Sequence, residues 1–237
     1  MEINLFGKER HIPLNGLNVS RQLEYALLME YLKLTGSELL LDVACGDGYW
    51  TAKMIPEAKS IIGFDMNDKR LLQAQKLAPG LSGAIRSDAH HLPFKDESFD
   101  DTIGICVLEH FQDDVGALKE LRRVTKTGGK IALTVDSFSY PGMSDEEKAG
   151  HAEKFSVAHH YTIESMTEKL RQADFEVTQW DYLLRNPISA NLYRLALKVP
   201  KLAYFLFPIS YPLSLWSERL SKNRSNGYKL AVAARAL

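Results

Sequence analysis

The sequence predicts an α/β fold in which helices cover both faces of a doubly wound, mostly parallel sheet. Three observations lead to this fold class. Strand-like and helix-like segments alternate from Glu38 onward, a glycine loop follows the first strand, and acidic residues stand where successive strands end. In such sheets a ligand binds beyond the carboxyl ends of the strands, so we expect the binding site at that edge.

Seven short runs rich in apolar residues carry the strand pattern: residues 39–43, 60–64, 83–86, 99–105, 130–135, 175–184 and 228–233. Helix patterns separate or follow them at residues 49–55, 69–77, 113–124 and 162–173, the last with Thr162 as its N-cap. Residues 136–160 break the alternation, and we expect a polar loop there with one helical piece.

Two segments lie outside this alternation. Residues 20–34 predict an N-terminal helix, capped by Ser20, that packs over the ligand; Arg10, His11 and Tyr25 are the nearby side chains placed to reach it. A helical insertion is expected between the last two strands. The predicted organisation is therefore one domain over residues 1–237, divided into 1–37 (cap), 38–184 (core), 185–225 (insertion) and 226–237 (last strand).

Charge is distributed unevenly although the whole chain carries only −1. Residues 185–237 hold nine of the 29 basic residues and one of the 30 acidic residues, about +8, which leaves about −9 on residues 1–184. An acidic body with a basic end does not fit a general nucleic-acid binder, and we expect no nucleic-acid partner.

The cysteines and the apolar stretches indicate the cellular compartment of the protein. Cys45 and Cys106 are far apart in sequence and lie in apolar runs, which is typical of a reduced intracellular protein. We see no secretory signal in the first ten residues. The longest apolar stretch, residues 202–216, contains Pro208 and Pro212 and is shorter than the roughly 20 residues that cross a bilayer. We expect a cytoplasmic protein, with peripheral membrane contact left open.

The glycine loop is the strongest chemical signal. The run Asp42-Val-Ala-Cys-Gly-Asp-Gly48 follows an apolar strand and opens a helix, so Gly46 and Gly48 allow a ligand to approach the backbone closely. A purely structural turn is the alternative. Asp65 ends the next strand, where a carboxylate accepts hydrogen bonds from both ribose hydroxyls of a nucleoside. Asp88 follows the third strand, where it is placed to accept from an adenine amine.

The chain resembles class I S-adenosylmethionine-dependent methyltransferases, closest to the type 11, ubiquinone/menaquinone-methyltransferase-like group. The resemblance is carried by these residues, by the strand start Phe99-Asp100, and by the later runs Val107-Leu-Glu-His110, Glu120 to Val124 and Thr127-Gly-Gly-Lys130. The resemblance covers residues 38–184 and the last strand. It implies a Rossmann-like, seven-stranded fold, S-adenosylmethionine as cofactor, and methyl transfer to a small-molecule or lipid-like acceptor at oxygen or carbon.

The resemblance also implies which residues bind the cofactor. Asp42 and the loop residues Ala44, Cys45, Gly46 and Gly48 would hold the methionine part. Asp65 with Met66 would hold the ribose, Asp88 and Ala89 the adenine, and Val107 would line the methyl-transfer side. Ala44 departs from the pattern, because the family often has glycine there.

Two other functions remain as alternatives. One is a non-catalytic cofactor-binding or membrane-peripheral partner protein on the same fold. The other is an NAD-dependent dehydrogenase, but Thr51 stands where the dinucleotide motif needs its third glycine. Asp42 would also repel a pyrophosphate, whereas it suits the ammonium group of methionine.

Histidines are the candidate general bases because their pKa lies near neutrality. His110 follows the fourth strand and His160 ends the polar loop, and both are expected to face the acceptor; a capping or packing role is the alternative for each. Tyr161 is expected in a lid. The other histidines have no spacing typical of a metal site, so no metal is expected. Cys106 is interpreted as a core residue.

The insertion, residues 185–225, combines aromatic and aliphatic residues with flanking lysines and arginines. This composition fits contact with an anionic membrane surface. A lid over the acceptor and a homodimer interface are equally compatible with it.

Overall fold

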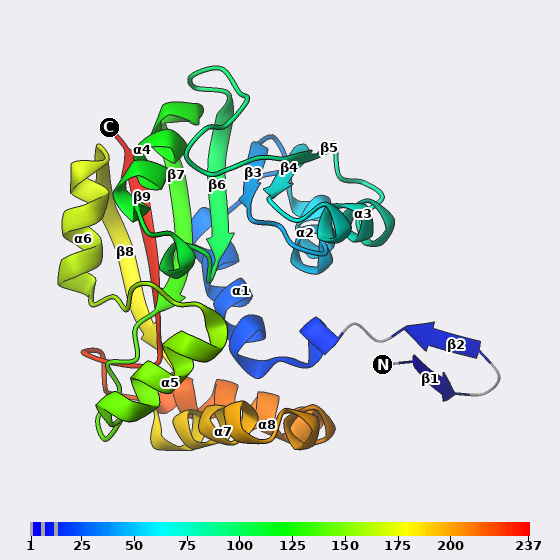
Figure 1. Ribbon diagram of the computed structural model, residues 1–237, viewed down its shortest axis with the longest axis vertical. Coiled ribbons are helices and arrows are strands. Elements are labelled where there is room, and N and C mark those ends of the chain that lie inside the picture. Colours follow the sequence, from blue (N-terminus) through cyan, green and yellow to red (C-terminus); the bar gives the residue numbers. More distant parts are fainter. Residues whose placement is uncertain (1, 6–7, 12–13) are drawn as a thin grey trace.

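A seven-stranded sheet forms the centre of the computed structural model, which describes residues 2–5, 8–11 and 14–237 (Figure 1). The strand order is β5-β4-β3-β6-β7-β9-β8, and only β9 runs antiparallel to its neighbours. The strands are β3 (Leu39–Val43), β4 (Ser60–Asp65), β5 (Gly83–Arg86), β6 (Phe99–Ile105), β7 (Thr125–Asp136), β8 (Phe175–Leu183) and β9 (Lys229–Ala236). The predicted Rossmann-like fold class is confirmed.

Helices cover both faces of this sheet because consecutive strand residues point to opposite sides. Leu40 packs in the core with Leu28 of α1, whereas Leu41 packs in the opposite core with Leu118 of α4. The helices between the strands are α1 (Val19–Leu32), α2 (Tyr49–Met54), α3 (Asp68–Leu77), α4 (Asp114–Val124) and α6 (Ile163–Gln172), which Thr162 caps as predicted.

Three further helices gather at the end of the sheet toward which β6 points (Figure 1). They are α5 (Asp145–Phe155), the helical piece expected in the polar loop, and α7 (Pro187–Lys198) and α8 (Pro200–Leu220). The predicted helical insertion between the last two strands is thus a helical pair. Because α5, α7 and α8 lie at the carboxyl ends of the parallel strands, they border the edge where a ligand is expected.

The prediction that Ser20 caps α1 is wrong. Asn18 caps the helix by accepting from the backbone N–H of Arg21, and α1 begins at Val19. Ser20 instead donates its hydroxyl to the buried carboxylate of Glu24, at 2.6 Å. Both residues are good caps, but the hydroxyl of Ser20 is engaged by Glu24 within the same helix and Asn18 takes the role.

Pro208 and Pro212 lie inside α8 and do not interrupt it. Both prolines lie on the exposed side of the helix. The carbonyl groups that lose their N–H partners there can be hydrated, which lowers the usual cost of proline inside a helix.

A short antiparallel hairpin of β1 (Glu2–Leu5) and β2 (Lys8–His11) precedes the rest of the chain and is drawn apart from the main sheet (Figure 1). The sequence did not lead us to expect it. Arg10 and His11 lie in β2, and their side chains are outside the described part of the structure.

Candidate active site

A cavity of about 770 Å³ opens at the carboxyl ends of the parallel strands. Residues from the glycine loop, α1, β4, α5, α7 and the segment after β6 line it. Among the residues predicted from the sequence, its walls contain Ala44, Cys45, Gly46, Asp65, Val107 and His110. Segments far apart in the sequence therefore meet where the fold class predicted a site.

The glycine loop owes its shape to three residues in the left-handed region. Ala44, Gly46 and Gly48 have φ values of 51°, 60° and 77°. A Cβ at Gly48 would lie 2.7 Å from the Cα of Ala74, so this glycine lets α2 and α3 approach each other. Gly48 thus supports the loop, while Gly46 lies at the cavity wall.

Asp65 is fixed at the edge of the cavity. Its carboxylate accepts from the backbone N–H of Gly46 at 3.0 Å and from that of Asn67 at 2.8 Å. These bonds join the end of β4 to the glycine loop and hold the carboxylate in one orientation. A rigid acceptor of this kind is suited to a pair of ribose hydroxyls.

Asp42 lies buried beneath the loop and does not line the cavity. Its carboxylate accepts from the hydroxyl of Thr51 at 2.5 Å, which is a structural reason for threonine at that position. Burial, with a smaller contribution from the nearby Asp65, raises the pKa of Asp42 to about 7. A cationic group bound above the loop would favour its ionised form.

The predicted adenine and ribose residues Asp88, Ala89 and Met66 do not line this cavity. The carboxylate of Asp88 accepts from the backbone and ring N–H groups of His90, at 3.0 and 2.7 Å, and these bonds hold the pKa of Asp88 below its usual range. Ala89 is buried, whereas the side chain of Met66 is largely exposed.

The two predicted bases differ in position. His110 lines the cavity, and its Nδ1 lies 3.1 Å from the carbonyl oxygen of Ser156. His160 does not line it; its ring packs against Phe138, and burial lowers its pKa. Tyr161 is a core residue and not part of a lid, because its hydroxyl donates to Asp114 from a buried position.

A cluster of buried charged residues forms a part of the cavity that sequence reasoning missed. Glu24, Glu109, Asp136 and Lys229 all line the cavity and are all buried. Lys229 contacts the carboxylate of Asp136. The sequence holds a signal for two of them, since Asp136 and Lys229 stand at the ends of otherwise apolar strands, but their pairing depends on β9 lying beside β7.

Cys106 belongs to the same cluster, so its interpretation as a plain core residue is incomplete. Its sulfur lies 2.8 Å from a carboxylate oxygen of Glu24 and 3.2 Å from the ammonium nitrogen of Lys229. Burial raises the pKa of the Cys106 thiol, which keeps it protonated. The thiol therefore acts here as a hydrogen-bond donor inside a polar wall.

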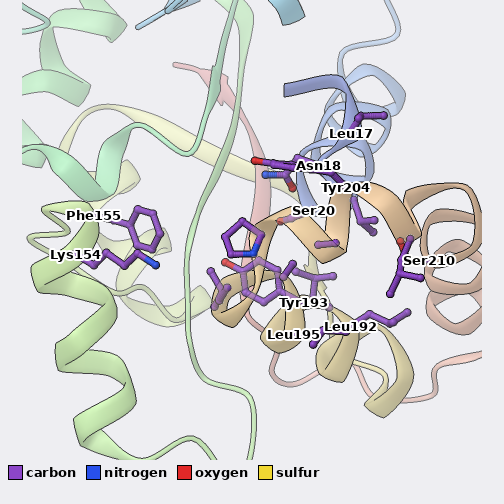
Figure 2. Close-up of a pocket in the computed structure, with 17 residues that line it drawn as sticks. Leu17, Asn18, Ser20, Lys154, Phe155, Leu192, Tyr193, Leu195, Tyr204 and Ser210 are labelled. Atoms are coloured by element: carbon purple, nitrogen blue, oxygen red, sulfur yellow. The ribbon is translucent and has the colours of Figure 1, made fainter. Parts of the chain in front are cut away.

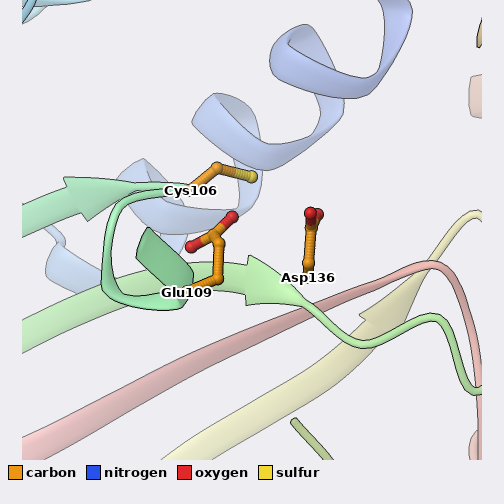
Figure 3. Close-up of side chains that lie close together, drawn as sticks. All are labelled: Cys106, Glu109 and Asp136. Atoms are coloured by element: carbon orange, nitrogen blue, oxygen red, sulfur yellow. The ribbon is translucent and has the colours of Figure 1, made fainter. Parts of the chain in front are cut away.

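Cys106, Glu109 and Asp136 also stand close enough to share one ion, with ligand atoms within 4.8 Å of one another (Figure 3). The ammonium group of Lys229, however, already contacts Asp136 and Cys106. A lysine placed there supplies the positive charge that a metal would supply, so the arrangement is one of an internal ion pair.

A second cavity of about 210 Å³ adjoins the first and is lined mainly by apolar side chains (Figure 2). The beginning of α1, the end of α5, and α7 with α8 enclose it. Five residues line both cavities: Asn18, Ser20, Phe155, Tyr193 and Leu197. The arrangement thus joins a polar cavity, suited to a nucleoside, to an apolar chamber.

Residues 41–133 match the model of a family described as a methyltransferase domain. A curated demethylmenaquinone methyltransferase of Lactobacillus johnsonii is 39% identical over 111 residues, which are 43% of this chain and 45% of that protein. A tRNA U34 carboxymethyltransferase of Campylobacter hominis is 32% identical over 115 residues, or 47% of this chain and 40% of that protein. The match thus spans less than half the length of these relatives.

Solved structures share the fold over most of the chain. A geranyl diphosphate C-methyltransferase of Streptomyces coelicolor, solved with Mg²⁺, geranyl diphosphate and S-adenosylhomocysteine, superposes with a TM-score of 0.70. It is 13% identical, and the match covers 92% of this chain and 78% of that one. At this identity the likeness concerns the fold.

Proposed function

We propose that this chain, in which residues 41–133 form a class I S-adenosylmethionine-dependent methyltransferase domain of type 11, transfers a methyl group to a small-molecule or lipid-like acceptor at oxygen or carbon. The observation that carries the proposal is the single cavity that joins the glycine loop and the fixed carboxylate of Asp65 to a polar wall beyond Val107. One end suits a nucleoside with an amino acid, and the other leaves room for an acceptor.

The residues at the loop fit this cofactor. The backbone of Ala44, Cys45, Gly46 and Gly48 would hold its methionine part, and Asp42 beneath the loop would reach the ammonium group through water. The buried Asp42, whose pKa burial raises, gains a cationic partner when such a group binds. This donor set is unsuited to a pyrophosphate, which argues against NAD.

The remaining cofactor residues follow the strand ends. Asp65, with Met66 beside it, would bind the ribose, and Asp88 and Ala89 would bind the adenine. Val107 would lie at the methyl-transfer side. When bound, the cofactor supplies an activated methyl group on a sulfonium; the protein aligns the acceptor and excludes water.

The apolar chamber supports a lipid-like acceptor. It meets the polar cavity at Phe155, Tyr193 and Leu197, so a molecule that crosses this boundary can place a polar head in one cavity and an apolar part in the other. The chamber reaches α8, the helix with the most exposed apolar surface.

Helix α8 buries polar residues and exposes apolar ones, the reverse of an ordinary amphipathic surface helix. Its buried residues are Ser210, Ser214, Ser217 and Glu218, whereas its exposed side carries an apolar stripe. The stripe is formed by Leu202, Phe205, Ile209, Leu213, Trp216 and Leu220, which are between 37% and 82% exposed. Over the described residues, no helix is long and apolar enough to cross a membrane.

We therefore extend the proposal to peripheral binding of an anionic membrane through this stripe, within the segment 185–225. Lys201 and Arg219 are exposed at its two ends, and the exposed side of α8 carries no acidic residue, which matches an anionic lipid surface. A homodimer through the same stripe is the alternative that the vesicle experiment below separates.

Calorimetric titration with S-adenosylmethionine, S-adenosylhomocysteine and NAD tests the central proposal. We expect the first two to bind and NAD not to bind. Asp65→Ala should weaken binding about 10- to 100-fold, because it removes a charged acceptor and loosens the loop. Asp68→Ala, an exposed acid on the same segment, is the matched control and should bind as the wild type does. Binding of NAD alone, or of no ligand by folded protein, would contradict the proposal.

A further inference from the structure

Glu109 is a buried carboxyl group whose charge is not balanced by a cation of its own. It is 1% exposed, it lines the cavity two residues after Val107, and its Oε2 has no hydrogen-bond partner among the residues that the structure describes. A buried polar atom without a partner costs free energy, so its presence at a cavity wall points to a ligand.

The titratable side chains around Glu109 come from several elements, and their charges can be compared. They are Arg21 and Glu24 of α1, Cys106 after β6, Asp136 of β7, His151 of α5 and Lys229 of β9. Arg21 pairs with Glu24 at 3.1 Å, and Lys229 pairs with Asp136. Within the described part of the chain, two cations thus face three carboxyl groups, and Glu109 is the third.

The consequence is a carboxyl group that keeps its proton near neutrality. Burial, followed by repulsion from Asp136, raises the pKa of Glu109 to about 8. His151 does not supply the missing charge, because burial lowers its pKa to about 4 and leaves its ring neutral.

We propose that Glu109 senses the charge of the cofactor: it loses its proton when a sulfonium cation enters the cavity, and as a carboxylate it then takes the proton of the methyl acceptor. This inference rests on the proposed function. It gives the role of general base to Glu109 and not to a histidine. It also implies an acceptor that carries an acidic proton, such as a hydroxyl group.

The step balances in charge and atoms. The acceptor oxygen forms a bond to the methyl carbon, while the bond from that carbon to the sulfonium sulfur breaks and its electron pair stays on sulfur. The hydroxyl proton passes to the carboxylate of Glu109. The sulfur becomes neutral as Glu109 becomes neutral, so the two buried charges disappear together.

The expected size of the effect follows from Coulomb's law. A unit positive charge about 8 Å away, at an effective dielectric constant of about 20, favours the carboxylate about 30-fold. At pH 7 this changes Glu109 from mostly protonated to mostly ionised, and about two thirds of a proton is released for each sulfonium bound.

The test is calorimetric titration at pH 7 in two buffers of different ionisation enthalpy, which counts the protons released on binding. Asp42 responds to the methionine ammonium, which S-adenosylmethionine and S-adenosylhomocysteine share. Only the former carries the sulfonium, so the difference between the two ligands reports the group that senses it. We expect S-adenosylmethionine to release about two thirds of a proton more, and sinefungin, which has a cationic amine in place of the sulfonium, to behave like S-adenosylmethionine.

Two variants test whether the additional proton comes from Glu109. In Glu109→Gln, an isosteric change that keeps the neutral form, the difference should vanish while both ligands still bind. In Glu153→Gln, an exposed position on α5, it should remain. Equal proton release by the two ligands in the wild type, or a difference that persists in Glu109→Gln, overturns the inference. Failure of both ligands to bind folded wild-type protein would instead reject the proposed function itself.

Discussion

At the scale of single residues, the pair of Lys229 and Asp136 is the costliest feature to disturb. Lys229→Met removes the ammonium group and leaves a buried carboxylate without its partner, so we expect the free energy of unfolding to fall by about 3–5 kcal/mol. Urea denaturation at pH 7 measures this change. Lys201→Met, at an exposed position of α8, should alter stability by less than about 0.5 kcal/mol.

The double variant Asp136→Asn with Lys229→Met separates loss of the pair from loss of packing. If the unpaired carboxylate is the cause, the double variant should recover a substantial part of the stability lost by Lys229→Met. A loss that the second substitution does not reduce would mean that the lysine stem, and not its charge, stabilises the fold.

The sequence placed Gly46 and Asp65 at the cavity but missed the buried charged residues that line it, for a physical reason. Gly46 and Asp65 are placed by local rules, a loop after one strand and an acid at the end of the next. Glu24 and Lys229 face the same cavity only because α1 packs on β7 and β9, which no local pattern reveals. His160 was misjudged in position for the same reason, since its packing against Phe138 is a tertiary contact.

At the scale of elements, the reversed polarity of α8 leads to a prediction about membranes. Phe205→Ser with Trp216→Ser should weaken sedimentation with vesicles of mixed neutral and anionic phospholipid about 10- to 100-fold, because two aromatic anchors are lost. The control, Leu72→Ser with Leu77→Ser, removes comparably exposed apolar side chains from α3 and should leave sedimentation unchanged.

Sedimentation velocity distinguishes the alternative use of the stripe. If the wild type does not sediment with vesicles but forms a dimer that the α8 variant dissociates, the stripe is a contact between two copies. Equal vesicle binding by the wild type and both variants would contradict a role for α8 in membrane contact.

Most element boundaries followed from periodicity. The strands at 39–43, 83–86 and 99–105 have the predicted bounds. For α8 the sequence predicted only a helical insertion without bounds, because local rules disfavour proline inside a helix and do not show which side of the helix faces water.

At the scale of the whole molecule, buried carboxyl groups make stability depend on pH. The pKa values of Asp42 and Glu109 are raised to about 7 and about 8, so the folded chain keeps protons that the unfolded chain releases above about pH 4. Their contribution is present below that pH and is lost as the pH rises toward 8. His151, whose lowered pKa keeps it neutral when folded, opposes this trend only partly.

Between pH 5.5 and pH 8 we therefore expect the free energy of unfolding of the ligand-free protein to fall by about 3 kcal/mol. Urea denaturation across this range measures the slope. In Glu109→Gln most of this decrease should be lost, because only Asp42 and Asp101, whose pKa burial raises to about 6, then contribute to it and His151 opposes them. A stability that rises steadily to pH 8 would show that these carboxyl groups are ionised in the folded state.

The position of β9 has a consequence for how the protein is made. β8 lies at the sheet edge and pairs only with β9, which also pairs with β7, so β8 has no neighbour in the sheet until residues 229–236 have been synthesised. Lys229, which pairs with Asp136, arrives with the same strand. A nascent chain that ends before β9 can assemble β3 to β7 as it leaves the ribosome, but it exposes an unpaired edge and an uncompensated buried carboxylate. The strand that completes the sheet and the lysine that compensates Asp136 therefore arrive together, with residues 229–236.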